Sequence, residues 1–403
     1  MTERLYYHDS LLYEFDAEVV EAANGSRPAV VLDRTAFYPT SGGQVFDTGW
    51  IVAAPEQKVR VAEVAERDDG AILHFIDRPL EPGIRVHGLI DSQRRRDHMR
   101  QHSGQHVLSA AFIRLFEMPT VSFHMGEDYC SIDLETRSLS PQQVEAAERM
   151  ANETVMENRP VSIRFVSQAE AQTLGLRKLP PMEKDELRLI EIQDFDLTAC
   201  GGTHVRGTGQ IGAILLRKVE KVKQGWRVEF VCGERAVATA RRDFTTLTEA
   251  AGLFSSALTE VPAQIGKHLE ETRSLRKSRE QLLGELATLD AIRLLAETPD
   301  SGGKKIVMRV FPDRDLNYIK LLAQKITRQT PGAIALMGST ATPAALVFAA
   351  SPGQPADMNA LMKEVLARLG GRGGGSQDMA QGGPQDVEQI AAVLAELSGR
   401  LKR

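Results

Sequence analysis

Two short strings together offer four candidate metal ligands, His102-Ser-Gly-Gln-His106 and Cys200-Gly-Gly-Thr-His204. In each string the two candidate ligands are four positions apart. Side chains at that spacing on a helix lie on one face, roughly 5–6 Å apart. Three imidazoles and one thiolate form a borderline-soft donor set that suits Zn²⁺. The sequence therefore predicts a single zinc site made by His102, His106, Cys200 and His204.

The pattern leaves two uses for such a zinc ion open. Four protein ligands close a structural site, whereas a catalytic zinc needs an open position. Either one ligand is labile and the zinc is catalytic, or the zinc anchors a substrate while water attacks from elsewhere. A thermolysin-type protease needs a glutamate directly after the first histidine. That position is Ser103, which disfavours peptide hydrolysis. His98 is a competing ligand at the same spacing, and we interpret it as a solvent-facing residue.

A helix is expected to position the first string. Apolar and small residues recur at helical spacing from Arg94 to Phe116, and Pro119 ends the pattern. Strand-like runs at 187–192, 212–217 and 226–231 flank the second string. Residues 91–252 are therefore predicted to form an α+β zinc-binding domain, with helices laid on an antiparallel sheet.

Three further regions complete the predicted α+β organisation. Residues 1–90 contain short β-branched runs between turns, which predicts a small N-terminal β-barrel. Residues 253–300 are predicted as a helical connector, one long helix or a hairpin. Its spaced leucines fit either a dimer seam or a surface helix packed on its own domain. Residues 301–403 alternate strands and helices, which predicts a C-terminal α/β domain with a glycine-rich loop at 370–383.

Composition narrows the class of protein. The 403 residues are 42% hydrophobic and 26% charged, ordinary values for a globular protein of two or three domains. No apolar run is long enough to span a membrane, and the N-terminus lacks the apolar stretch of a signal peptide. Three cysteines fit a reducing compartment, so a cytoplasmic protein is expected. A net charge of −5 means that RNA binding would need local basic patches.

The strings and two other blocks carry a resemblance to a known family. Residues 35–49, Thr-Ala-Phe-Tyr-Pro-Thr-Ser-Gly-Gly-Gln-Val-Phe-Asp-Thr-Gly, and the two metal strings resemble, in order, the editing domain of alanyl-tRNA synthetase and the free-standing AlaX proteins. The glycine-rich segment 371–383 resembles the DHHA1-type domain that ends these synthetases. A C-terminal extension of this kind is a property of long-form AlaX proteins. One departure is Ser103, where the family usually has threonine.

This resemblance implies a zinc-dependent aminoacyl-tRNA deacylase that acts in trans and without ATP. The implied substrate is Ser-tRNA(Ala), with Gly-tRNA(Ala) second. A synthetase pocket for a methyl side chain cannot strongly reject serine or glycine. A second site that hydrolyses the wrongly charged tRNA is therefore needed. An aminoacylating enzyme would need a preceding catalytic domain, and the chain starts at the barrel, so no aminoacylation is expected.

The resemblance and the residue types also suggest individual roles. Gln44 and Ser103 are the candidate catalytic residues, and they are expected to bind substrate together with Thr35 and Gly43. Hydrogen bonds from the site to the seryl hydroxyl would favour hydrolysis of Ser-tRNA over Ala-tRNA, because an alanyl group would leave the polar groups of the site without partners. The structural alternative for Gln44 is an amide that stabilises its turn. No carboxylate stands out as a general base, and Asp133 is a weak candidate.

Phosphate contacts are expected from two basic clusters, one at the start of the ligand helix and one after the second string. The first cluster is Arg94-Arg-Arg96 with Arg100, and the second is Arg217-Lys218 with Lys221 and Lys223. The residues expected to contact the tRNA are Arg94, Arg95, Arg100, Lys218 and Lys221. The alternative is a solvated charged face. A homodimer through the connector or the C-terminal domain is a further expectation. Two rival functions are a non-catalytic, zinc-stabilised tRNA-binding module and a general zinc hydrolase of small esters.

Overall fold

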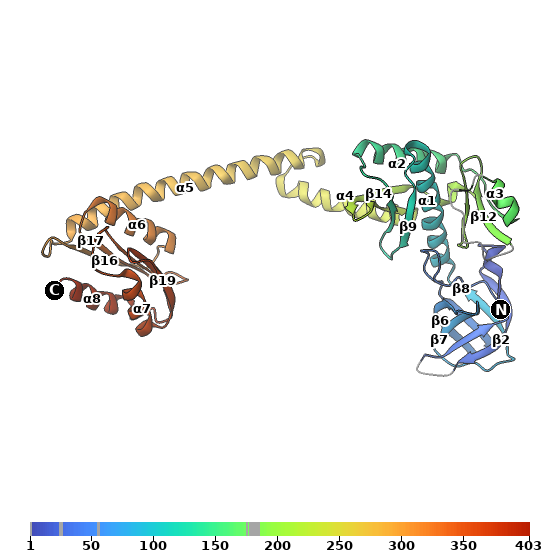
Figure 1. Ribbon diagram of the computed structural model, residues 1–403, viewed down its shortest axis with the longest axis horizontal. Coiled ribbons are helices and arrows are strands. Elements are labelled where there is room, and N and C mark those ends of the chain that lie inside the picture. Colours follow the sequence, from blue (N-terminus) through green and yellow to red (C-terminus); the bar gives the residue numbers. More distant parts are fainter. Residues whose placement is uncertain (1, 24–26, 55–56, 175, 177–185) are drawn as a thin grey trace. The chain divides into compact units, whose positions relative to one another are not determined.

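The computed structural model describes residues 2–23, 27–54, 57–174, 176 and 186–403 (Figure 1). The chain divides into two units, Met1–Glu249 and Ala250–Arg403. Among the described residues, no helix is both long and apolar enough to cross a bilayer.

The first unit begins with a closed six-stranded barrel, which confirms the barrel expected for the N-terminal region. The chain starts with β1 (Glu3–Arg4) and a 3-10 turn, η1 (Leu5–Tyr7). Strand β1 pairs with β4 (Arg34–Thr35), outside the barrel. Around the barrel, neighbouring strands follow the order β2-β3-β7-β6-β5-β8. Alternate residues of β2 are buried, as the pleat of a half-buried strand requires. The barrel strands are β2 (Glu14–Ala23), β3 (Ala29–Leu32), β5 (Gly49–Ala54), β6 (Gln57–Glu66), β7 (Ile72–Ile76) and β8 (Arg85–Ile90).

Helix α1 (Ser92–Phe116) follows the barrel and contains the first metal string. The Asp91 carboxylate caps its first turn by accepting from Gln93 N and Arg94 N. The helix packs closely on the sheet at Gly104, where a Cβ atom would lie 2.3 Å from Cys232 Sγ. The glycine between the two histidines therefore sets how near the ligand helix comes to the sheet.

Two antiparallel sheets complete the first unit, and the mixed α+β fold expected there is confirmed. One has the order β14-β15-β10-β9 and the other β11-β12-β13. Ser140 and Gln143 form a capping box at the start of α2. The elements are β9 (Thr120–Met125), β10 (Cys130–Leu134), α2 (Pro141–Met156), β11 (Val161–Ser167), α3 (Gln168–Thr173), β12 (Glu186–Ile192), β13 (Asp196–Ala199), η2 (Thr208–Ile211), β14 (Ile214–Val222), β15 (Gly225–Cys232) and α4 (Glu234–Phe254).

The second unit is a sheet with helices on both faces. The strand order is β16-β17-β18-β20-β19. One face packs against α6 and the end of α5, and the other packs against α7 and α8. The region expected to be one helix or a hairpin is the single helix α5. The elements are η3 (Leu258–Glu260), α5 (Val261–Glu297), β16 (Lys305–Phe311), α6 (Leu316–Gln329), β17 (Ala333–Ser339), β18 (Ala345–Ala350), α7 (Met358–Leu369), β19 (Gly371–Gly375), β20 (Met379–Pro384) and α8 (Ile390–Leu401).

One expectation for this unit was wrong. The glycine-rich segment predicted as a loop is the β19–β20 hairpin. Gly371 has φ +101°, and a Cβ atom there would lie 2.0 Å from Gly383 O. The glycines therefore allow two strands to approach closely, in a sequence whose composition alone is typical of a linker.

Candidate metal centre

The four residues predicted as ligands lie together. The ligand atoms of His102, His106, Cys200 and His204 are all within 4.8 Å of one another. Cys200 Sγ is 3.5 Å from His102 Nε2 and 3.3 Å from His204 Nε2. A tetrahedral zinc site with ordinary bond lengths would separate sulfur and nitrogen by about 3.5 Å. The donor set and its spacing therefore fit Zn²⁺.

Each imidazole is held through the nitrogen that faces away from the cluster. His102 Nδ1 donates to Gln44 Oε1 at 2.8 Å. His204 Nδ1 lies 3.1 Å from Ser103 Oγ, and His106 Nδ1 lies 3.5 Å from Asp196 Oδ2. Hydrogen-bond partners at this position fix the tautomer and the ring direction of metal-binding histidines. The three side chains that contact the rings thus leave each Nε2 for a metal ion.

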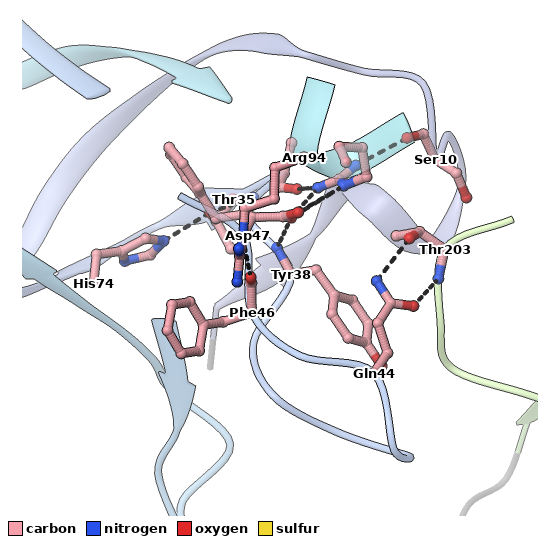
Figure 2. Close-up of polar contacts among 12 residues, drawn as sticks. Ser10, Thr35, Tyr38, Gln44, Phe46, Asp47, His74, Arg94 and Thr203 are labelled. Atoms are coloured by element: carbon pink, nitrogen blue, oxygen red, sulfur yellow. Dashed lines mark hydrogen bonds and ion pairs between the residues drawn. The ribbon is translucent and has the colours of Figure 1, made fainter. Parts of the chain in front are cut away.

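Gln44 is fully buried, and its amide contacts the first metal string at His102 and the second at Thr203, the latter contact being drawn in Figure 2. Its Oε1 also accepts from Thr203 N at 3.1 Å, and its Nε2 donates to Thr203 Oγ1 at 2.8 Å. Gln44 therefore ties α1 to the loop after β13. The Gln44 amide thus supports the two metal strings rather than its own turn, and Gln44 does not line the cleft described below.

The two glycines of the second string differ in what surrounds them. A Cβ atom at Gly202 would lie 2.1 Å from His102 Cε1 and 3.0 Å from Gln44 Oε1. At Gly201 the nearest atom would be Tyr7 Oη at 3.5 Å, an ordinary contact. Of these two glycines, it is therefore Gly202 whose lack of a side chain lets the His102 ring pack against the loop.

The local electrostatics favour the metal-binding forms of two ligands. Burial opposes ionisation of the Cys200 thiol, but the neighbouring His102 and His204 outweigh it and hold the pKa of Cys200 well below its usual value. Burial also holds the pKa of His204 well below its usual value. Metals bind the thiolate of cysteine and the neutral imidazole of histidine.

A cleft of about 660 Å³ lies beside the ligands. Gln105 lines it and is 6% exposed; its Nε2 donates to Ser109 Oγ at 2.8 Å, which leaves Oε1 for a bound molecule. Within the described part of the chain, no aspartate or glutamate lines this cleft. The lining residues are Tyr38, Ser41, Gly42, His102, Gln105, His106, Ile113, Pro119, Thr120, Val121, Ser122, Phe123, Thr198, Ala199, Cys200, Gly201 and Gly202.

The weak candidate for a general base is engaged elsewhere. Asp133 forms an ion pair with Arg227 and accepts from Ser122 Oγ at 2.7 Å. The hydrogen bond from Arg227 lowers the pKa of Asp133. Asp133 is therefore held as an ion-pair partner in the sheet and does not line the cleft.

Three other residues predicted to touch substrate are positioned differently. Thr35 is buried in the barrel, where its Oγ1 lies 2.8 Å from His74 Nε2 (Figure 2). Ser103 is buried against the second string, where Oγ also accepts from Val205 N at 3.2 Å. Gly43 has φ +84°, and its carbonyl accepts from Met125 N at 3.1 Å. None of the three lines the cleft, and their contact with substrate stays a prediction.

The first basic cluster also needs a correction. Arg95 is 0% exposed, forms an ion pair with the equally buried Asp47, and donates to Ser10 O at 2.9 Å. It therefore cannot reach a phosphate in this fold. His98, expected to face solvent, is buried as well. Since α1 is enclosed along most of its length, polar residues on it are not exposed by default.

The remaining basic candidates are at least partly accessible. Arg94 is half-buried and donates to Phe46 O at 3.0 Å (Figure 2). Arg100 pairs with Glu234, and Lys218 pairs with Glu220. Lys221 is exposed. Contact of these four residues with RNA stays a prediction.

Three family models match the chain. The model described as tRNA synthetases class II (A) covers residues 2–94, the threonyl and alanyl tRNA synthetase second additional domain covers residues 187–229, and the DHHA1 domain covers residues 302–403. Each of the first two matches contains part of the site described above, because they include Gln44 and the second metal string.

Curated relatives match over almost the whole chain. An alanyl-tRNA editing protein, AlaX-L, of Pyrococcus horikoshii is 31% identical over 97% of this chain and 98% of its own. Alanine–tRNA ligases of Archaeoglobus fulgidus and Methanothrix thermoacetophila are 32% and 33% identical over 98% of this chain. The chain spans 44% of the length of these two ligases.

Proposed function

The chain belongs to the AlaX-L family of alanyl-tRNA editing proteins, and we propose that it hydrolyses the ester between a wrong amino acid and tRNA(Ala). The observation that carries this proposal is the four-ligand cluster beside an open cleft, in a chain that matches an editing protein over nearly its full length. Ser-tRNA(Ala) is the first proposed substrate and Gly-tRNA(Ala) the second, since a methyl-selective synthetase cannot strongly reject either amino acid. We place this activity in the cytoplasm.

Zn²⁺ is the cofactor that the donor set favours, held by His102, His106, Cys200 and His204. A bound zinc ion would supply Lewis-acid polarisation of the ester carbonyl or a more acidic water. The surrounding residues keep the ligand rings in place: Gln44, Ser103 and Asp196 each contact the Nδ1 atom of one histidine.

Gln105 is best placed to distinguish serine from alanine. Its Nε2 is bound to Ser109, and Ser109 Oγ also accepts from Thr120 Oγ1 at 2.7 Å, which fixes the direction of the amide. The remaining oxygen can accept the seryl hydroxyl in the cleft. An alanyl methyl group would bury this oxygen without a partner, which costs free energy. Hydrogen-bonding capacity in the cleft therefore favours serine.

The tRNA partner would be bound by exposed or partly exposed cations of the first unit. Lys221, Lys218, Arg100 and Arg94 are the candidates, and each would contribute through phosphate charge rather than base sequence. Association of two chains through α5 or the C-terminal unit is a further proposal from the sequence. A non-catalytic tRNA-binding module is the second candidate function, because four protein ligands suit a structural zinc.

The deciding experiment presents the full-length protein with Ser-, Gly- and Ala-tRNA(Ala), with and without a chelator. We expect rapid release of serine and glycine, slow release of alanine, and loss of both rapid reactions when the metal is removed. Release of serine and glycine no faster than that of alanine would contradict the editing proposal. Tight binding of tRNA(Ala) without release would favour the non-catalytic module.

A further inference from the structure

A buried arginine contacts the backbone of the cysteine ligand. Arg188 lies on β12, is 8% exposed, and does not line the cleft. Its Nη1 donates to Cys200 O at 2.6 Å, and its Nε donates to Tyr7 O at 2.8 Å. Its own carbonyl accepts from Cys200 N at 3.2 Å. One residue therefore holds both backbone polar groups of Cys200 and joins them to the turn that precedes the barrel.

The charge of this arginine has no acidic partner in the described part of the chain. Its guanidinium carbon lies 5.4 Å from the centre of the Tyr7 ring, and its Nη2 has no hydrogen-bond partner among the described residues. The hydrogen bonds of the Arg188 side chain in this part of the chain therefore go to the carbonyls of Cys200 and Tyr7.

We propose that Arg188 is a positioning residue for the metal centre, which fixes the Cys200 backbone so that Sγ converges with the three imidazoles. This inference rests on the proposed zinc site but not on the proposed tRNA substrate. A residue that acts in this way should change metal affinity and the metal–sulfur bond, whereas a merely structural arginine would change stability alone.

The test uses full-length Arg188→Met and Arg188→Lys, with Arg164→Met as the matched control. Arg164 lies on the adjacent strand β11 and forms a half-exposed pair with Glu191. Zinc affinity is measured by competition with a chromophoric chelator, and the thiolate charge-transfer band is recorded with Co²⁺. We expect Arg188→Met to bind zinc about 10–100-fold more weakly and to lose band intensity, as is typical when outer partners of a metal site are removed. Arg164→Met should match the wild type.

The lysine variant keeps the test decisive if the methionine variant does not fold. Lysine retains the charge but cannot donate in a fork to both carbonyls, so an intermediate affinity is expected. Wild-type affinity and band intensity in Arg188→Lys, or in a folded Arg188→Met, would overturn the proposal. Deacylation of Ser-tRNA(Ala) is measured separately on the wild type. If wild-type protein binds zinc but does not deacylate, the proposed function fails while the role of Arg188 stands.

Discussion

At the scale of single residues, the site depends on atoms that touch the ligands rather than on the ligands alone. Gln44, Ser103 and Asp196 contact the far nitrogens of the three histidines, and Gly202 gives the His102 ring its space. These contacts set ring directions, which the spacing of the ligands along the chain does not determine. Small changes beside the ligands should therefore alter metal binding without removing a ligand.

Gly202→Ala is the sharpest such change. Its added methyl group would collide with the His102 ring, so we expect zinc affinity to fall about 10–100-fold, in the range seen when supporting contacts are lost. Gly201→Ala is the matched control, because its methyl group makes only ordinary contacts. Zinc competition titrations on both variants measure the effect. Equal affinities for the two variants would contradict the packing argument.

Gln105→Leu tests how the cleft recognises the amino acid attached to the tRNA. A leucine keeps the approximate volume but cannot accept the seryl hydroxyl. Loss of one neutral hydrogen bond of about 1 kcal/mol predicts a roughly fivefold lower kcat/KM for Ser-tRNA(Ala). Gly-tRNA(Ala), which lacks the hydroxyl, should change little, so the measured quantity is the ratio of the two rates. An unchanged ratio would show that another group binds the hydroxyl.

At the scale of elements, α1 contains the first metal string and also anchors the barrel. Arg95 reaches from α1 to Asp47, and Asp47 also accepts from Tyr38 N at 2.7 Å (Figure 2). Breaking a buried ion pair leaves one charge uncompensated. The base of the helix should therefore be much less tolerant of substitution than its exposed side.

Arg95→Met should lower the free energy of unfolding by about 3–5 kcal/mol, because Asp47 would be left buried and unpaired. Its neighbour Arg96 is exposed, so Arg96→Met should change stability by about 0.5 kcal/mol or less. Urea unfolding followed by the fluorescence of Trp50 and Trp226 measures both variants. If Arg95→Met instead kept its stability and lost affinity for tRNA, the original prediction of a phosphate contact would be right.

These elements also indicate which features the sequence could predict. The barrel and the ligand helix follow from periodicity, and the four ligands follow from residue type and spacing. Arg94, Arg95 and Arg96 are identical in type, yet a helix turns by about 100° per residue, so only Arg95 is directed into the interior. Residue type does not determine whether a side chain points into the interior or to the surface. For the same reason Thr35 was assigned to a substrate site. Gln105 was missed because an amide between two histidines has no distinctive pattern.

At the scale of the whole molecule, the first unit brings together segments that are far apart in the chain. Gln44, from the turn between β4 and β5, bonds to Thr203, and Ser10 Oγ accepts from His204 N at 3.1 Å. Arg188 joins Cys200 to Tyr7. Such contacts between residues more than 150 positions apart require the full three-dimensional arrangement, and no local sequence pattern contains them.

The barrel's contacts with the metal loop have a consequence for how this protein can be recombined. Gln44 and Ser10 of the barrel region bond directly to two of the five residues of the second string, Thr203 and His204, so the barrel region is part of the support of the metal centre. An editing module transferred to another protein would have to include both the barrel and the sheet. Recombination near residue 91 would separate the metal ligands from Gln44 and Ser10, which contact them or their loop. Exchange of other modules is expected to be tolerated only after the end of the first unit.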